Sequence, residues 1–297
     1  MWNPIKWQLR PLEAPCTPRG PAFSKAAPVN FSVGGSKIQL RLNRPSGGLN
    51  KNYTDVGGDH PLDNAEAFDP AIYTPSGPID LEKQVLLYYS WAYFGPPFTG
   101  FVAELGCAIS LVSGVRASDQ HSLFCPENFE HHIEWWLRNA FGNPEEFNCG
   151  HPRWSTPNNW RLLDLGDLTG VLLDAVTCRG AGERKRYLVF PVAHDKYIEI
   201  GFRLKQYEPG SIEELDAIID PSSMIGMVDN VVKSVEVALS DLAKSQLADA
   251  QNKYLGKKLT AYKRPLRFTT AEDDVRWAEY QALQKEAKQN SSPFAWV

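Results

Sequence analysis

The stretch that decides the fold is Arg186-Tyr-Leu-Val-Phe-Pro-Val-Ala193, followed after His194-Asp195 by Lys196-Tyr-Ile-Glu-Ile-Gly-Phe-Arg-Leu204. Both runs are apolar and rich in β-branched and aromatic residues, and the two residues between them are polar. Two such runs joined by a short turn predict a β-hairpin, and therefore an antiparallel sheet. The hairpin contains neither a glycine-rich phosphate loop nor a nucleophile motif, so it indicates a scaffold and no particular reaction.

The neighbouring segments extend this sheet. Short polar turns separate four consecutive apolar runs, which favours a meander over β-α-β units. The four predicted strands are Trp160–Leu165, Gly170–Cys178, Arg186–Ala193 and Lys196–Gln206.

Three segments upstream are also expected to be strands. Val29–Leu42 predicts a hairpin turned by Gly34-Gly35. Val85–Phe94 predicts a buried strand that ends at Gly95-Pro96-Pro97. Phe101–Leu111 matches a strand period and a helical stripe equally well, and its glycine and β-branched residues favour a strand paired with the preceding run.

Helices are expected in three places. Pro126–Phe141 has one apolar face and is followed by Gly142, a natural helix stop. Thr270–Asp273 approximates a capping box that opens a final helix over 270–289. From Met224 onward, a third helix is expected to lie across one face of the sheet, because it has an apolar stripe of Val228, Val231, Val235, Ala238, Leu239 and Leu242.

The sequence therefore predicts an α+β fold, an antiparallel sheet of hairpins and a meander packed by helices, with a helical C-terminal part. Three regions are expected along the chain. Residues 1–28 form an irregular proline-rich arm, 29–250 the main domain, and 251–297 a basic linker with the last helix. Within the main domain, 44–80 and 144–159 are expected to be loops.

Composition limits the class of protein. The 297 residues carry a formal net charge of −4, which argues against nucleic acid as a general partner. The amino terminus lacks a continuous apolar core, and no stretch approaches the roughly 18 apolar residues that span a bilayer. The five cysteines, an odd number, indicate reduced thiols. We therefore expect a cytoplasmic protein with no membrane partner.

Motifs for catalysis and metal binding are absent from the sequence. One cluster holds His121, Cys125, His131, His132, Cys149 and His151, but no CxxC or HExxH pair occurs in it. His131 and His132 would point about 100° apart on a helix, so they could not easily share one ion. There is no GxSxG motif, and His194-Asp195 fits a polar turn better than a proton shuttle. We expect no metal, no cofactor and no enzymatic activity.

Charge is distributed unevenly, which is the more useful signal. Seven acids and three Lys or Arg residues lie between Asp195 and Asp220, and no Lys or Arg lies between Asp59 and Glu82. Six bases and no acid lie between Lys253 and Arg267. Such polarity can steer a charged partner, although solvated surface loops would show the same pattern.

Two features carry a family resemblance. The run Ala92-Tyr-Phe-Gly-Pro-Pro-Phe98 resembles the aromatic-Gly-Pro signature of some bacterial immunity proteins, with Phe94 in place of tryptophan and Pro97 in place of a basic residue. The meander followed by a helix is similar to the α+β architecture of PsbP-like domains. The resemblance implies a protein that neutralises a cognate nuclease toxin of a type VI or contact-dependent system.

An inhibitor of this kind would cover a basic nuclease cleft with an acidic surface. The chain is therefore expected to display an acidic loop at 207–220, just after the last strand of the meander. The first-choice contacts are Asp195, Tyr207, Glu208, Glu213, Glu214 and Asp216, and the second-choice contacts are Asp63, Glu66 and Asp69.

Other functions and partners stay open at this point. One alternative is a hydrolase that uses His131 or His194 with a distant carboxylate. Another is a structural or adaptor component of a secretion or phage apparatus. A second copy of the chain, giving a homodimer, is an alternative partner.

Overall fold

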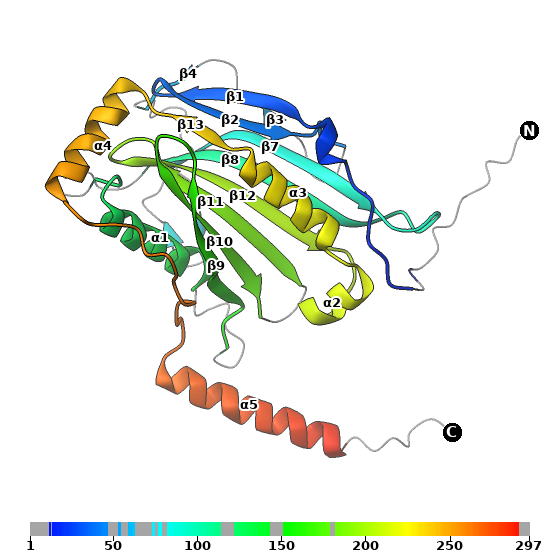
Figure 1. Cartoon of the computed structure of the whole chain (residues 1–297). Helices are drawn as coiled ribbons and strands as arrows, with labels where there is room; N and C mark the ends of the chain where they lie inside the picture. The colour runs from blue at the N-terminus through cyan, green and yellow to red at the C-terminus, as the bar shows by residue number, and fades with distance from the viewer. Residues whose placement is uncertain are drawn as a thin grey trace, which may run out of the picture.

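The computed structural model describes residue 12 and the ranges 14–46, 53–54, 59–62, 73–74, 77–78, 82–113, 122–142, 151–178 and 182–290. Over these ranges it confirms the predicted α+β fold, with a large antiparallel sheet, a smaller sheet and helices around them (Figure 1). No helix in these ranges combines the length and apolar character needed to cross a membrane.

The larger sheet has the strand order β3-β7-β8-β12-β11-β10-β9, and every neighbouring pair is antiparallel. The predicted meander forms the last four strands of that order, β12-β11-β10-β9. Its strands are β3 (Tyr53–Thr54), β7 (Glu82–Phe94), β8 (Phe101–Ser113), β9 (Trp154–Asp164), β10 (Thr169–Thr177), β11 (Glu183–Pro191) and β12 (Lys196–Gln206).

The smaller sheet has the order β13-β2-β1-β4. Its centre is the predicted hairpin, turned by Gly34 and Gly35, whose φ angles of 53° and 77° require the left-handed region that glycine tolerates. Its strands are β1 (Ala27–Val33), β2 (Ser36–Leu42), β4 (Asp59–His60) and β13 (Glu236–Ala238), and β5 (Tyr73–Thr74) pairs separately with β6 (Gly77–Pro78).

The ambiguous run 101–111 is strand β8, paired with β7 as expected. Residues 102–107 and 109–112 are buried on both faces of the sheet. A strand covered on both faces has no reason to alternate apolar and polar residues, which explains why its sequence also fitted a helix.

Two predictions about the following segments are wrong. Residues 154–159 belong to β9, although 144–159 was expected to be a loop. Pro157, Asn158 and Asn159 suggested a turn, but β9 is the last strand of the sheet and its pairing with β10 has register shifts here. An edge strand tolerates proline and irregular pairing because one side has no strand to bond.

The second error concerns the helix expected from Met224. α3 (Ser222–Lys233) ends early, β13 follows, and α4 (Asp241–Lys253) is a separate helix. Two serines separate these elements. Ser234 Oγ donates to Val231 O at the end of α3, and Ser240 Oγ accepts from Ala243 N at the start of α4. Val235 and Leu239 are still buried, but Leu242 is exposed.

The helices cover the two faces of the large sheet. α3 and the small sheet pack on one face, and α1 (Pro126–Phe141) packs on the other, over β9 to β11 (Figure 1). Trp136 of α1 meets Tyr187 of β11 edge-on with ring centroids 5.0 Å apart. β8 and β12 therefore lie in the middle of the larger sheet.

After α4 the chain returns across α1. We call residues 255–270 the strap. Trp160 Nε1 donates to Thr260 O at 2.7 Å, and Leu266 N donates to Thr156 O at 2.8 Å. The predicted last helix is α5 (Ala271–Asn290), which begins with the expected Thr270 and Asp273 capping bonds. It lies outside the two sheets (Figure 1) and contacts the body at Trp277, whose ring centroid is 4.3 Å from that of His151.

Candidate functional site

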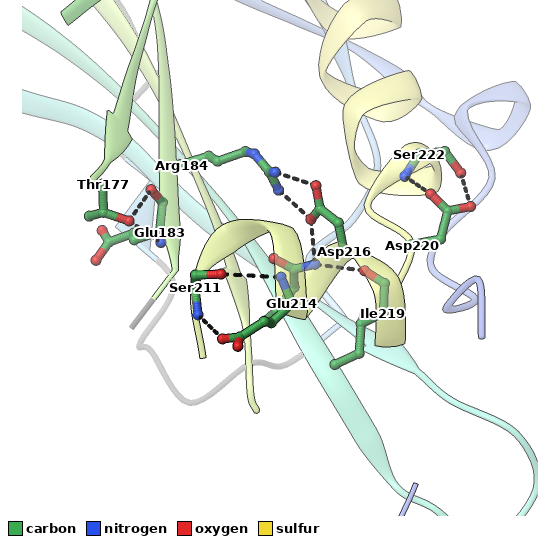
Figure 2. A network of polar contacts seen from close by, with 10 residues as sticks. Thr177, Glu183, Arg184, Ser211, Glu214, Asp216, Ile219, Asp220 and Ser222 are labelled. Carbon is green, nitrogen blue, oxygen red and sulfur yellow. Dashed lines mark hydrogen bonds and ion pairs between the residues drawn. The ribbon is translucent and has the colours of Figure 1, made fainter. Parts of the chain in front are cut away.

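The acidic segment after β12 is not a simple loop. Residues 207–211 turn the chain away from the sheet, and Ile212–Ile218 form helix α2. A capping box starts this helix: Ser211 Oγ accepts from Glu214 N, and Glu214 Oε2 accepts from Ser211 N at 2.8 Å (Figure 2). The expectation of a loop over 207–220 is corrected to a short, capped helix, and Glu214 is part of the cap.

α2 is bonded to the sheet through Asp216. Arg184 of β11 donates to both carboxylate oxygens of Asp216, one of them at 2.8 Å (Figure 2). Gln206, the last residue of β12, donates to Asp216 Oδ1 at 3.0 Å and to Ile219 O at 2.6 Å. A two-point Arg–carboxylate pair fixes direction as well as distance. Asp216 therefore holds α2 against the sheet.

The segment that follows α2 is fixed by Asp220. This carboxylate accepts from the side chain and backbone of Ser222 and from Thr17, and these hydrogen bonds lower the pKa of Asp220. The backbone of Cys16 bonds to Ile218 O and Asp220 N, each at 2.9 Å. Residues 16–19, which lie within the predicted arm of 1–28, are thus part of this corner of the fold.

Two other acids of the segment, Glu208 and Glu213, make no such structural contacts with the described residues. We call Glu208, Glu213, Glu214, Asp216 and Asp220 the acidic corner. No Lys or Arg occurs between 207 and 220. Glu213 is exposed and Glu208 is partly exposed, and neither carboxylate has a hydrogen bond or ion pair with any described residue. These two are the acids that a partner could engage without disturbing the fold.

Tyr207 links the acidic corner to a second surface. Its hydroxyl donates to Glu104 of β8, and burial together with this carboxylate raises the pKa of Tyr207. Its ring meets Phe101 edge-on, with centroids 5.3 Å apart, and Lys205 Nζ lies 5.0 Å from its centre. Tyr207 is consequently held in place by neighbours on β8 and β12.

The turn that carries the immunity-protein resemblance lies beside this tyrosine. Phe94 pairs with Phe101 across the β7–β8 hairpin, and both adjoin the turn that contains Phe98. The three phenylalanines are 49%, 39% and 54% exposed, in the order Phe94, Phe101, Phe98. Exposed aromatic side chains next to charged groups are typical of protein interfaces. We call these three residues the phenylalanine edge.

Sequence reasoning did not name the phenylalanine edge as a contact surface. A signal was present, because Gly95-Pro96-Pro97 forces a turn at the end of two long strands. Aromatic residues on either side of such a turn have little sheet to pack against.

The structure separates Asp195 from the other predicted contacts. Asp195 precedes β12 and forms an ion pair with Lys196 at 2.8 Å, whereas Tyr207 follows the other end of this 11-residue strand. A strand rises about 3.3 Å per residue, so the two residues are on the order of 35 Å apart. Asp195 therefore does not share a surface with the acidic corner. Asp63, Glu66 and Asp69 lie outside the described residues.

The histidine and cysteine cluster does not converge where it can be followed. His121 and Cys149 lie outside the described residues, and within the described ones no group of three His, Cys, Asp or Glu side chains could hold an ion. His131 is exposed. His132 is on α1, and its ring is 5.0 Å from that of Tyr197 of β12. Burial lowers the pKa of His132 to about 4.

The other titratable residue of interest is His194. Its Nδ1 is 3.1 Å from Gln246 Nε2 and 3.9 Å from Asp195 Oδ1, and its side chain is 46% exposed. His131 and His194 therefore both lie at the surface, whereas the hydrolase alternative calls for one of them in a pocket with a distant carboxylate.

The chain was compared with protein-family models, with curated proteins and with solved structures, and none of the three comparisons found a match.

Proposed function

We propose that the chain is a non-enzymatic inhibitor in the cytoplasm, a bacterial immunity protein that binds a cognate nuclease toxin and covers its basic cleft. The contact surface consists of the phenylalanine edge, Tyr207 and the acidic corner. The nuclease identity of the partner rests on the resemblance of residues 92–98, and the binding role rests on the described surface.

One observation carries the proposal. The turn that resembles the immunity-protein signature and the acidic segment, over 100 residues apart in sequence, meet through the contact between Phe101 and Tyr207. Apolar anchors beside unpaired carboxylates suit a basic partner, because the anchors supply affinity while the charges speed and orient the encounter.

The acidic part of this surface is fixed by hydrogen bonds within the fold, which favours binding. Asp216, Glu214 and Asp220 hold the backbone of the acidic corner in place through the bonds described above. A partner would therefore lose little affinity to ordering this surface. Glu208 and Glu213 are the charges that would contact it.

The proposed function requires a toxin gene next to the gene for this chain, and the purified product of that gene is the partner for the test. The double variant Glu208→Lys/Glu213→Lys should slow association at low salt about tenfold or more, and the effect should shrink as salt is added. The matched control is Glu236→Lys/Asp249→Lys, which changes the same number of charges on exposed residues elsewhere. Equal association rates for the two double variants would contradict the electrostatic part.

The apolar part is tested separately. Phe94→Ala and Phe98→Ala should each weaken the affinity about tenfold, mostly through faster dissociation. Growth protection of cells that express the toxin gives the biological readout. Full protection and unchanged affinity with both phenylalanines replaced would overturn the proposed surface.

A structural or adaptor role is the second candidate, and α5 favours it. This helix lies outside the two sheets (Figure 1). Its Val275 and Leu283 are 57% and 64% exposed. Light scattering of the full chain and of a chain that stops after Thr270 distinguishes the two functions. An oligomer, such as a homodimer, that is lost with α5 would support the assembly role.

A further inference from the structure

A cavity of about 760 Å³ lies at the other end of the large sheet from the acidic corner. It lies between the end of α4, the turn before α1, the β9–β10 hairpin and the first residues of the strap. Its walls are largely apolar, with Phe124, Leu162, Leu168, Leu247, Ala250 and Leu259 among the lining residues. Small-molecule pockets in proteins have this size, about 300–1,000 Å³, and this apolar character.

The rim of the cavity exposes a large apolar side chain. Leu255 lines the cavity, and 81% of its surface is open to solvent. It stands in the turn that leads from α4 into the strap, next to Gly256, whose φ of +79° makes that turn. An exposed leucine side chain beside an apolar cavity provides apolar surface that a ligand could bury.

Two of the four charged residues that line the cavity already have ion-pair partners. Lys257 forms an ion pair with Glu127. Asp167 pairs with Lys244 at 3.2 Å and accepts from Leu239 N at 2.9 Å. These contacts join the strap to α1 and the β9–β10 hairpin to α4, so they shape the cavity and leave little charge for a ligand.

Two lining charges have no ion pair among the described residues. Asp164 accepts from Gly166 N at 3.0 Å, within its own hairpin. Lys258, on the strap, has neither an ion pair nor a hydrogen bond with a described residue. Lys258 is therefore the cation that the cavity offers to a ligand.

We propose that this cavity binds a small amphiphile, a molecule with an aliphatic chain and an anionic head group. The chain lies against the leucines of α4 and the β9–β10 hairpin, and the head group pairs with Lys258. Carboxylate and phosphate head groups share this chemistry. The site is independent of the proposed toxin surface, because the two lie at opposite ends of β11.

The first experiment titrates the full chain with the fluorescent fatty acid 11-(dansylamino)undecanoic acid and, separately, with its methyl ester. The acid should bind saturably with one molecule per chain, and the uncharged ester about fivefold more weakly. Lys258→Ala should weaken binding of the acid about fivefold and leave the ester unchanged, since a partly exposed ion pair contributes about that much. Lys233→Ala, an exposed lysine on α3, is the control and should change neither.

The second experiment fills the cavity from its edge. Gln251 lines it from an exposed position on α4, so Gln251→Trp should weaken binding of both ligands at least tenfold. Asn252→Trp adds the same ring to the adjacent exposed residue, which does not line the cavity, and should bind normally. Absence of saturable binding, or equal binding by the two tryptophan variants, overturns the site. Equal affinity for acid and ester, or no effect of Lys258→Ala, overturns the anionic head group.

Discussion

The acidic corner and the strap are charged segments of opposite sign, and the fold uses their charges differently. On the strap, Lys257 pairs with Glu127 and Lys263 pairs with Glu130 and Glu134 of α1. In the acidic corner, one arginine bonds to Asp216, while Glu208 and Glu213 stay unpaired among the described residues. Acids of α1 thus neutralise much of the positive charge of the strap, whereas the acidic corner retains carboxylates that a partner could bind.

The difference shows what a run of charge in a sequence can mean. The bases of 253–267 suggested a surface that could attract a charged partner, but Lys257 and Lys263 pair with acids of a helix about 130 residues earlier. The acids of 207–220 have no comparable set of bases opposite them. Four predictions, each with a matched control variant, concern these two segments and the helix that the strap crosses.

The largest effect is expected where the strap meets α1. Lys263→Ala should lower the free energy of unfolding by about 3 kcal/mol, because it leaves the nearly buried Glu130 carboxylate without its cation. Lys258→Ala, on the same strap but without an ion pair among the described residues, should change it by less than about 0.5 kcal/mol. Urea denaturation measures both. Equal losses would show that the strap's ion pairs do not hold it.

The second effect concerns His132 of α1, the helix that the strap crosses, and the stability of the protein at acidic pH. Burial lowers the pKa of His132 to about 4, below the value of about 6.5 expected in the unfolded chain. The unfolded chain therefore binds a proton at His132 more readily than the folded protein does. The neutral His132 stabilises the folded state fully above pH 6.5, and this stabilisation is lost as the pH falls toward 4.

His132→Phe should remove that pH dependence, which we expect to amount to about 2 kcal/mol between pH 7 and pH 4.5. His131→Phe, at the exposed neighbouring position, should keep the wild-type slope. Unfolding free energies measured at the two pH values decide between them, and parallel slopes for wild type and His132→Phe would contradict the prediction.

A smaller effect is expected at the acidic corner. Asp216→Asn weakens the pair with Arg184, whose partners are partly exposed, so about 1 kcal/mol of stability should be lost. Glu208→Lys/Glu213→Lys should cost less than about 0.5 kcal/mol. If the double charge reversal destabilises the protein more than Asp216→Asn does, the division into structural and available acids is wrong.

The smallest effect tests the cap of α2. Glu214→Ala should cost about 0.5 kcal/mol, because the Ser211 N–H loses its acceptor, whereas Glu214→Gln keeps that hydrogen bond. Thermal unfolding should separate the two variants by about 1–2 °C. Identical melting temperatures would mean that the capping box adds nothing to α2.

The elements that sequence predicted well are those determined by local pattern. β11 and β12 have β-rich runs with a turn between them, and α1 has a continuous apolar face. The first half of β9, residues 154–159, and β13 were missed because their strand character depends on neighbours. β9 is irregular and needs only one partner strand, and β13 is three residues long and pairs with β2, nearly 200 positions earlier.

The sequence predicted which acidic residues occur in the site, but neither their separate roles nor which of them lie together. Sequence identified the acids of 207–220, but it could not separate Glu213 from Asp216, because the distinction depends on Arg184 in another strand. It also placed Asp195 with them, since closeness in sequence concealed the length of β12. The contact between Phe101 and Tyr207 joins distant parts of the chain and left no local signal.

The contact of residues 16–19 with the acidic corner has a consequence during synthesis. Thr17 and Asp220 are 203 residues apart, and the backbone of Cys16 bonds on either side of Ile219. A ribosome that adds about 5–20 residues per second needs about 10–40 s to pass from one to the other. The corner therefore assembles only on nascent chains that have emerged past residue 220, and a truncated translation product would not present it.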